Sequence, residues 1–110
     1  MAGIARRAFD APDDTIVLEH GRMRVVESGG QQVWRSELEP GWSWDTDLKQ
    51  MAEGAPSCPM THREYVVAGR IRYLMDDGTE LIAGPGDVLF IEPGHRGWVV
   101  GDDTCVLVDW

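Results

Sequence analysis

Apolar and polar residues alternate in short runs along most of the chain after residue 14, and glycine or proline turns separate the runs. Runs of roughly four to seven residues recur about every ten positions, which predicts about eight to ten β-strands. An open sheet of that size would leave long apolar edges, so closure is favoured. The pattern therefore predicts an all-β fold, an antiparallel jelly-roll barrel.

Turn signals mark the points where neighbouring strands reverse. Asp77-Gly78 lies between two alternating runs and predicts a hairpin, because both residues tolerate positive φ. Gly84-Pro85-Gly86-Asp87 predicts a second tight turn. The run Val88–Ile91 is continuously apolar, which predicts burial on both faces. Residues 45–53 lack the β-branched enrichment seen elsewhere, so we expect at most one short helix, and we expect it there.

The strand predicted over residues 61–67 has two different faces. Successive side chains of a strand point to opposite sides, so His62 and Glu64 share one face and Tyr65 lies on the other. We expect Tyr65 and Trp98 to face away from any pocket and to pack beneath a second sheet or a partner subunit.

Two indoles stand two residues apart at Trp42 and Trp44, so both would face the same side of a strand. The pair fits a core or interface contact, in which large aromatic side chains are common. It also fits a platform on which a substrate stacks, and the sequence leaves both interpretations open.

The length of 110 residues predicts one domain. Residues 1–14 show no core-facing period, which indicates an N-terminal arm, and residues 15–110 form the single barrel domain. The formal net charge of −9 argues against a nucleic-acid partner, because phosphate binding needs clustered Lys and Arg.

Neither a secretory signal nor a membrane-spanning stretch is predicted, since no apolar run is long enough for either. We therefore expect a cytoplasmic protein without a membrane partner. In a reducing compartment, the two cysteines, Cys58 and Cys105, are expected to be thiols.

Residues that bind metals gather between Cys58 and His95. If the two histidine-bearing strands are neighbours, then Cys58, His62, Glu64 and His95 enclose a small metal pocket. Other interpretations stay open: His62 as a hydrogen-bonded pocket residue without metal, and Cys58 as a small buried thiol. A buried Glu64 needs a partner, because an unpaired buried carboxylate is costly. His20 stands beside a turn glycine and is expected to be a solvated loop residue.

The chain resembles the small single-domain cupins of the bacterial conserved-barrel type over roughly residues 40–110. The resemblance lies in three turn positions: Gly69, which closes the first family motif, then Gly86-Asp87 and Pro93-Gly94, which open the second motif and form its loop. The metal ligands depart from the family pattern. His62 stands where the family has glutamate, and either His95 or Gly97 stands at the histidine of the second motif, with His95 preferred.

Cys58 stands where the family has its second histidine, Pro56 where it has its first, and Val99 where asparagine is common. The resemblance implies a divalent transition metal, namely Zn, Fe, Mn or Ni. Cys58 as a ligand would favour zinc, whereas Glu64 would favour iron, manganese or nickel.

Three functions follow as hypotheses from the residues and the resemblance. The first is a metal-binding cupin with a small-molecule pocket, an oxygenase- or isomerase-type enzyme if it is catalytic. The second is a metal-free or structurally metallated module that binds or senses a small ligand without catalysis. The third is a dimer-forming barrel, in which tryptophans and valines of the outer strands make the contact, since the resemblance implies a homodimer.

Overall fold

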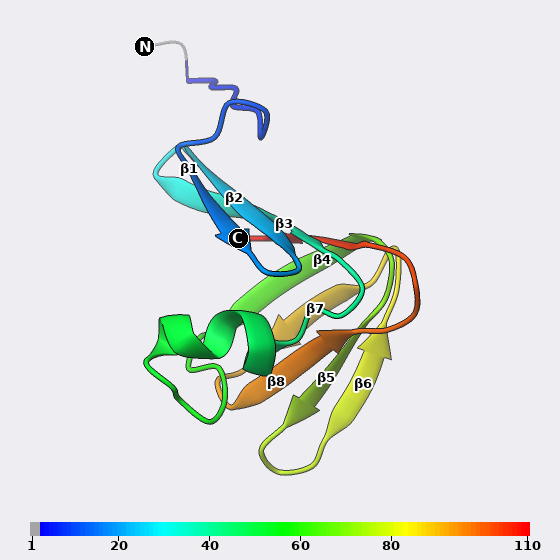
Figure 1. Cartoon of the computed structure of the whole chain (residues 1–110). Coiled ribbons are helices and arrows are strands. Elements are labelled where there is room, and N and C mark those ends of the chain that lie inside the picture. The colour runs from blue at the N-terminus through cyan, green and yellow to red at the C-terminus, as the bar shows by residue number, and fades with distance from the viewer. Residues whose placement is uncertain (1–2) are drawn as a thin grey trace.

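Antiparallel strands make up most of the regular structure in residues 3–110, the part of the chain that this computed structural model describes (Figure 1). One sheet has the strand order β1-β2-β3-β9-β4-β7, and a smaller sheet has the order β6-β5-β8. The strands are β1 (Asp14–Leu18), β2 (Gly21–Ser28), β3 (Gln31–Leu38), β4 (His62–Ala68), β5 (Ile71–Met75), β6 (Glu80–Ala83), β7 (Val88–Ile91), β8 (His95–Val99) and β9 (Cys105–Asp109). The predicted all-β jelly-roll fold is confirmed.

The hydrophobic core lies between the two sheets. Leu38, Val66 and Leu107 reach it from the larger sheet, and Ile71 and Tyr73 reach it from the smaller one. Each of these side chains is at most 7% exposed. Full burial of one large apolar side chain stabilises a fold by roughly 1.5–3 kcal/mol, so these strand faces hold the two sheets together.

The predicted helical segment forms two consecutive short turns, η1 (Trp44–Leu48) and η2 (Lys49–Ala52). Ser43 caps the first turn, because its hydroxyl accepts a hydrogen bond from the Thr46 amide at 3.0 Å. Trp44 is 3% exposed and anchors the turn to the core. The segment therefore winds where the sequence predicts it and is stabilised by packing.

The prediction that Val88–Ile91 is buried on both faces is wrong. This run forms β7, at one edge of the larger sheet. Ile91 is 7% exposed and belongs to the core, whereas Val88 and Phe90 are 68% and 57% exposed. The physical reason is that no layer of this chain covers the outer face of the edge strand.

Tyr65 and Trp98 both face away from the central cavity, as predicted, since neither contributes to its lining. Tyr65 is 41% exposed on the outer face of β4, so no second sheet of this chain covers it. Trp98 is half-buried, and the Arg72 guanidinium lies 4.9 Å from the centre of one of its rings. Within residues 3–110, packing of Tyr65 beneath a second sheet is therefore wrong, and packing against a partner subunit stays a prediction.

The N-terminal segment is tied to β2 by side-chain contacts. Arg7 pairs with Asp13 at 2.7 Å and donates a hydrogen bond to the Glu27 carbonyl at 3.0 Å. Arg24 on β2 donates to the Phe9 carbonyl at 2.9 Å. Residues 1 and 2 of the predicted arm lie outside the described residues, and β1 begins at Asp14. Among residues 3–110, no helix has the length and apolar character to cross a membrane.

Candidate metal centre

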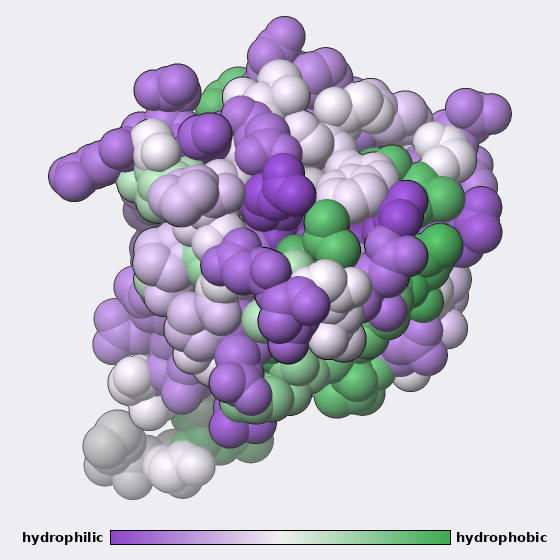
Figure 2. Space-filling model, turned by 90° about the horizontal axis from the view of Figure 1, so that it is seen from below, coloured by the Kyte–Doolittle hydropathy of each residue, from purple (hydrophilic) through white to green (hydrophobic). Residues whose placement is uncertain are grey.

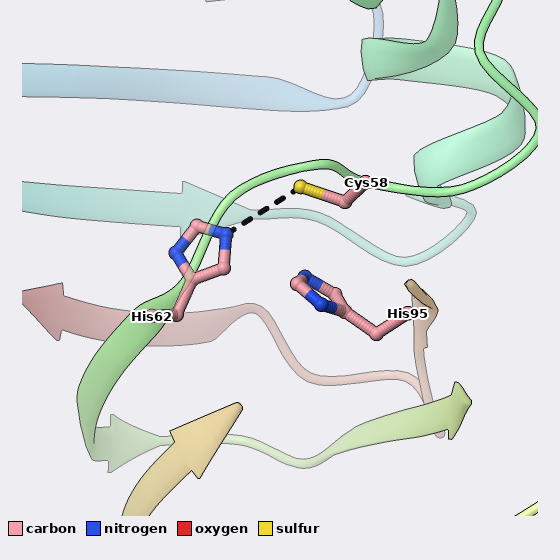
Figure 3. A group of neighbouring side chains, drawn as sticks. All are labelled: Cys58, His62 and His95. Atoms are coloured by element: carbon pink, nitrogen blue, oxygen red, sulfur yellow. Dashed lines mark hydrogen bonds between the residues drawn. The ribbon is translucent and has the colours of Figure 1, made fainter. Parts of the chain in front are cut away.

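The side chains of Cys58, His62 and His95 converge inside the barrel (Figure 3). Cys58 comes from the loop after η2, His62 opens β4, and His95 opens β8. Cys58 Sγ lies 3.6 Å from His62 Nε2, and the two imidazole rings are 5.0 Å apart between centres. One ligand atom from each of the three residues lies within 4.8 Å of the others. The geometry thus brings one sulfur and two nitrogens to one point.

Backbone hydrogen bonds hold Cys58 beside His95. The Cys58 amide donates to the His95 carbonyl at 2.8 Å, and the Gly94 amide donates to the Cys58 carbonyl at 2.8 Å. Of the two candidates that the sequence left for this position, His95 therefore lies at the cluster. Gly97 lies against the ring of Tyr73 instead, where an added Cβ would come within 2.9 Å of the ring.

In both histidines, Nδ1 lies near an oxygen atom of a neighbouring residue. His95 Nδ1 lies 2.8 Å from the Glu92 carbonyl, which can only accept, so the proton sits on Nδ1 and leaves Nε2 free. His62 Nδ1 lies 3.5 Å from Asp109 Oδ1, and its Nε2 faces Cys58. Oxygen partners of this kind orient metal-binding histidines, so both rings are arranged for coordination through Nε2.

The distance between Cys58 and His62 fits a tetrahedral metal. An ion with bonds of about 2.3 Å to sulfur and about 2.1 Å to nitrogen holds two such ligands about 3.6 Å apart. The separation of Sγ and Nε2 is 3.6 Å. Thiolate and imidazole are both ligands that zinc accepts, so the donor set and the spacing agree.

Glu64 does not join this cluster. It lies with His62 and Asp109 in a second group of possible ligands, and it stands directly opposite Asp109 across β4 and β9. Its carboxylate accepts a hydrogen bond from the Tyr73 hydroxyl and is 4.0 Å from His62 Nδ1. Of the four predicted ligands, the structure therefore gathers Cys58, His62 and His95, and it places Glu64 behind His62.

Ionisation is strongly perturbed around Cys58 and His62. Burial opposes charge on the thiol, but the hydrogen bond with His62 and the proximity of His95 outweigh it and lower the pKa of Cys58 to about 6. Burial also opposes charge on His62, yet hydrogen bonds with Asp109 and Cys58 raise its pKa to about 10. Near neutral pH the metal-free pair is therefore a thiolate beside an imidazolium.

Burial dominates the other titratable groups behind the cluster. Burial first, and then the charge of Asp109, raise the pKa of Glu64 well above its ordinary value. Burial raises the pKa of Cys105 to about 12. Cys58 and Cys105 are both free thiols, as predicted, and only Cys58 has thiolate character near neutral pH.

A cavity of about 610 Å³ opens beside the three side chains. Its lining includes the three candidate ligands and many apolar residues, among them both indoles of the Trp42 and Trp44 pair. These two tryptophans are 5% and 3% exposed and belong to the core. They serve as core residues and as cavity wall at once, so the two interpretations from the sequence are not exclusive.

Asp109 is the site residue that the sequence analysis missed. Its only signal is the alternation along β9, which places it on the same inward face as Cys105 and Leu107. His20 lies outside the site, but the expectation of a solvated side chain is wrong. Its Nδ1 lies 3.1 Å from Asp47 Oδ1, and its side chain is 30% exposed.

Comparison with known proteins identifies the fold. No protein-family model matches the chain, and no curated protein matches it by sequence. The fold is similar to that of oxalate decarboxylase from Bacillus subtilis, with a TM-score of 0.62 and 20% identity over 88% of this chain. Oxalate decarboxylase has Mn(II) centres. The chain covers 26% of that protein, so it spans about a quarter of its length.

Two smaller proteins share the same fold. The polyketide cyclase RemF from Streptomyces resistomycificus matches with a TM-score of 0.65 and 20% identity, over 96% of this chain and 77% of its own. A cupin-2 domain protein from Rhodospirillum rubrum matches with a TM-score of 0.60 and 15% identity, over 96% of this chain and 65% of its own. The chain therefore has a small cupin-type fold, as its sequence predicts, with a candidate metal-ligand cluster inside the barrel.

Proposed function

We propose that this chain is a metal-dependent cupin whose three-ligand centre serves a small-molecule cavity. Cys58, His62 and His95 are the proposed ligands. The convergence of their donor atoms within 4.8 Å carries the proposal. Glu64 and Asp109 stand behind His62 rather than at the metal.

The donor set favours zinc among the divalent transition metals. One thiolate and two imidazoles suit a tetrahedral zinc ion, whereas Fe(II) sites that react with oxygen use two histidines and a carboxylate. Manganese, found in oxalate decarboxylase, prefers oxygen ligands, which this cluster does not offer.

Three protein ligands beside a cavity favour catalysis over a purely structural metal. Structural zinc sites are closed by four protein ligands, whereas catalytic sites keep one position for water or substrate. When bound, a divalent ion supplies Lewis-acid activation of a coordinated group. Because zinc has no redox chemistry, an isomerase-type reaction is favoured over an oxygenase-type one.

Metal analysis of the purified protein tests the proposal. We expect about one zinc ion per chain, and we expect His62→Ala and His95→Ala each to lose most of it, since a missing ligand opens the site. His20→Ala is the matched control, because His20 pairs with Asp47 away from the cluster. Circular dichroism checks that each variant keeps its fold.

Two outcomes would contradict the ligand assignment. If metal persists in both His62→Ala and His95→Ala, then the ion binds elsewhere. If wild-type protein neither contains nor takes up a transition metal, then a metal-free ligand-binding module is the better function. The mutual contact of Cys58 and His62 at 3.6 Å favours this second candidate, because each satisfies the other without an ion.

We further propose that the chain acts in the cytoplasm as a homodimer. The dimer is supported by exposed apolar side chains on β4 and β7, including Val67 at 42%, Val88 at 68% and Phe90 at 57%. The cytoplasmic location is supported by the free thiols of Cys58 and Cys105, since thiols stay reduced in that compartment. A fractionation experiment that finds the chain outside the cytoplasm would refute the location.

A further inference from the structure

We propose that the cavity takes an uncharged, planar aromatic molecule that carries one oxygen donor, in preference to a small anion. The idea rests on the proposed function for the metal that the oxygen would reach. The apolar preference rests on the cavity alone. Its walls, its mouth, its charges and one unpaired donor each restrict the ligand.

The walls of the cavity are large and apolar. Trp42 and Trp44 contribute two indoles, and Leu38 and Leu107 contribute aliphatic surface, all at most 5% exposed. Aromatic rings pack against one another in stacked or edge-to-face arrangements, and their burial is strongly favourable. A volume of about 610 Å³ lies within the range of cavities that hold molecules of drug-like size.

Large apolar side chains stand among the exposed residues that line the cavity, beside the polar Gln31, Gln32, Thr61 and Arg63. Met51 on η2, Met60 in the loop before β4, and the C-terminal Trp110 all line it, and they are 56%, 60% and 48% exposed. Exposed methionines are adaptable contacts, because their side chains are flexible and polarizable. Apolar side chains at an entrance favour an apolar molecule over a hydrated ion, which would have to lose its water there.

The charges around the cavity disfavour anions. Arg63 is the one arginine or lysine among its lining residues in the described chain, and its guanidinium lies over the Phe90 ring, 4.9 Å from the centre. Phe90 is exposed on the outer face of β7, so this charge points away from the cavity. Glu64 and Asp109 also contribute to the lining. The cationic ring of His62 also faces the cavity, but it already lies 3.5 Å from Asp109 Oδ1 and 3.6 Å from Cys58 Sγ. A dianion would therefore find no free arginine or lysine, and the nearest cation already paired with acidic groups.

One buried donor lacks a partner. The indole N–H of Trp42 is buried, and no acceptor for it is found in the described residues. Trp42 itself belongs to the cavity wall. Buried donors usually have acceptors, so an oxygen on the ligand is the complement that this donor needs. The same oxygen chemistry suits a ligand of zinc.

Calorimetric titration of the zinc-loaded protein with three probes tests the proposal. The probes are 2-naphthol, naphthalene and oxalate, which represent an aromatic with an oxygen, an aromatic without one, and a small dianion. We expect one 2-naphthol per chain, bound roughly tenfold or more tighter than naphthalene. Oxalate chelates zinc by itself, so it is titrated into the metal-free protein instead, where we expect no measurable heat. Tighter binding of oxalate than of 2-naphthol would overturn the proposal.

Three variants locate the binding at this cavity. Met60→Glu places a charge at the mouth and should weaken both aromatic probes roughly tenfold. Ile82→Glu is the control, since Ile82 is similarly exposed, at 55%, and lies outside the cavity lining. Trp42→Phe keeps a ring but removes the N–H, so the advantage of 2-naphthol over naphthalene should shrink. Equal binding in Met60→Glu and wild type would show that the probes bind elsewhere.

The same titrations separate this inference from the proposed function. If one zinc binds per chain but neither aromatic probe does, then the metal centre stands and the ligand class is wrong. If both aromatic probes bind, Met60→Glu weakens them, and zinc does not bind, then the aromatic cavity stands and the metal does not. If removal of zinc abolishes the preference for 2-naphthol over naphthalene, then the oxygen of 2-naphthol binds the ion in the zinc-loaded protein.

Discussion

Asp109 acts at the scale of a single residue by orienting His62. Its Oδ1 is buried and lies 3.5 Å from His62 Nδ1, at the long limit of a hydrogen bond. An oxygen in this position keeps the proton on Nδ1 and turns Nε2 toward Cys58. Asp109 is thus a positioning residue of the proposed centre rather than one of its ligands.

Replacement of Asp109 should weaken metal binding without abolishing it. Loss of such a partner typically costs 10–100-fold in affinity, so we expect roughly that loss in Asp109→Ala. Asp109→Asn keeps an oxygen acceptor and should recover part of the affinity. Competition with a zinc chelator measures both, and Asp103→Ala, in an exposed turn, controls for the loss of one negative charge.

The residues of the site differ in how well the sequence predicts them. The grouping of Cys58, His62 and His95 was predictable because their side-chain types bind metals, and strand alternation directs His62 inward. Asp109 was not, because its relation to Glu64 depends on the pairing of β4 with β9, far apart in the chain. The separation of Glu64 from Cys58 depends on the same long-range register.

At the scale of elements, the end of β4 must pass very close to the start of β9. Gly69 has a φ of +73°, and a Cβ added there would lie 2.5 Å from the Thr104 carbonyl oxygen and 2.6 Å from Cys105 Cα. Only glycine accommodates both the backbone conformation and this approach. The close approach at this end of the β4–β9 pair therefore depends on Gly69.

A pair of glycine variants separates the effect of the positive φ at Gly69 from the effect of the close backbone approach. Gly29 has a φ of +60° but open space around it, so Gly29→Ala should lose about 1–2 kcal/mol of unfolding free energy from backbone strain alone. Gly69→Ala should lose roughly 1–3 kcal/mol more, because the methyl group overlaps backbone atoms. Denaturant unfolding measures both, and equal losses would show that the approach is not limiting.

The sequence predicts the elements of this fold well where the signals are local. The turns at Asp77-Gly78 and residues 84–87 join the predicted strands, and the helical turns lie within residues 44–52. The error concerns Val88–Ile91, because an apolar run does not reveal whether a strand is central or at an edge. That distinction depends on sheet order, which local patterns do not encode.

At the scale of the whole molecule, the outer surface is not uniformly polar. Seen from below, hydrophobic residues gather along one side of the molecule, while most of the remaining face is hydrophilic (Figure 2). Val88 and Phe90 on β7, with Tyr65 and Val67 on β4, are exposed apolar residues of the larger sheet. Such a group on a sheet edge favours contact with another chain.

Light scattering after size-exclusion chromatography measures the proposed dimer. We expect twice the chain mass of 12.3 kDa at micromolar concentration. The double variant Val88→Ser, Phe90→Ser should shift the protein toward monomer, because it removes apolar surface from the contact. Val17→Ser on β1 is the control, since Val17 is 81% exposed on a different strand. A wild-type monomer at that concentration would exclude the dimer.

The proposed ligands belong to different layers of the barrel. His62 opens a strand of the larger sheet, whereas His95 opens a strand of the smaller one and holds Cys58 through the backbone. An ion bound by all three would cross-link the two sheets, and its binding free energy would add to the stability of the folded chain. The lifetime of this small protein in the cell would then follow the supply of the metal.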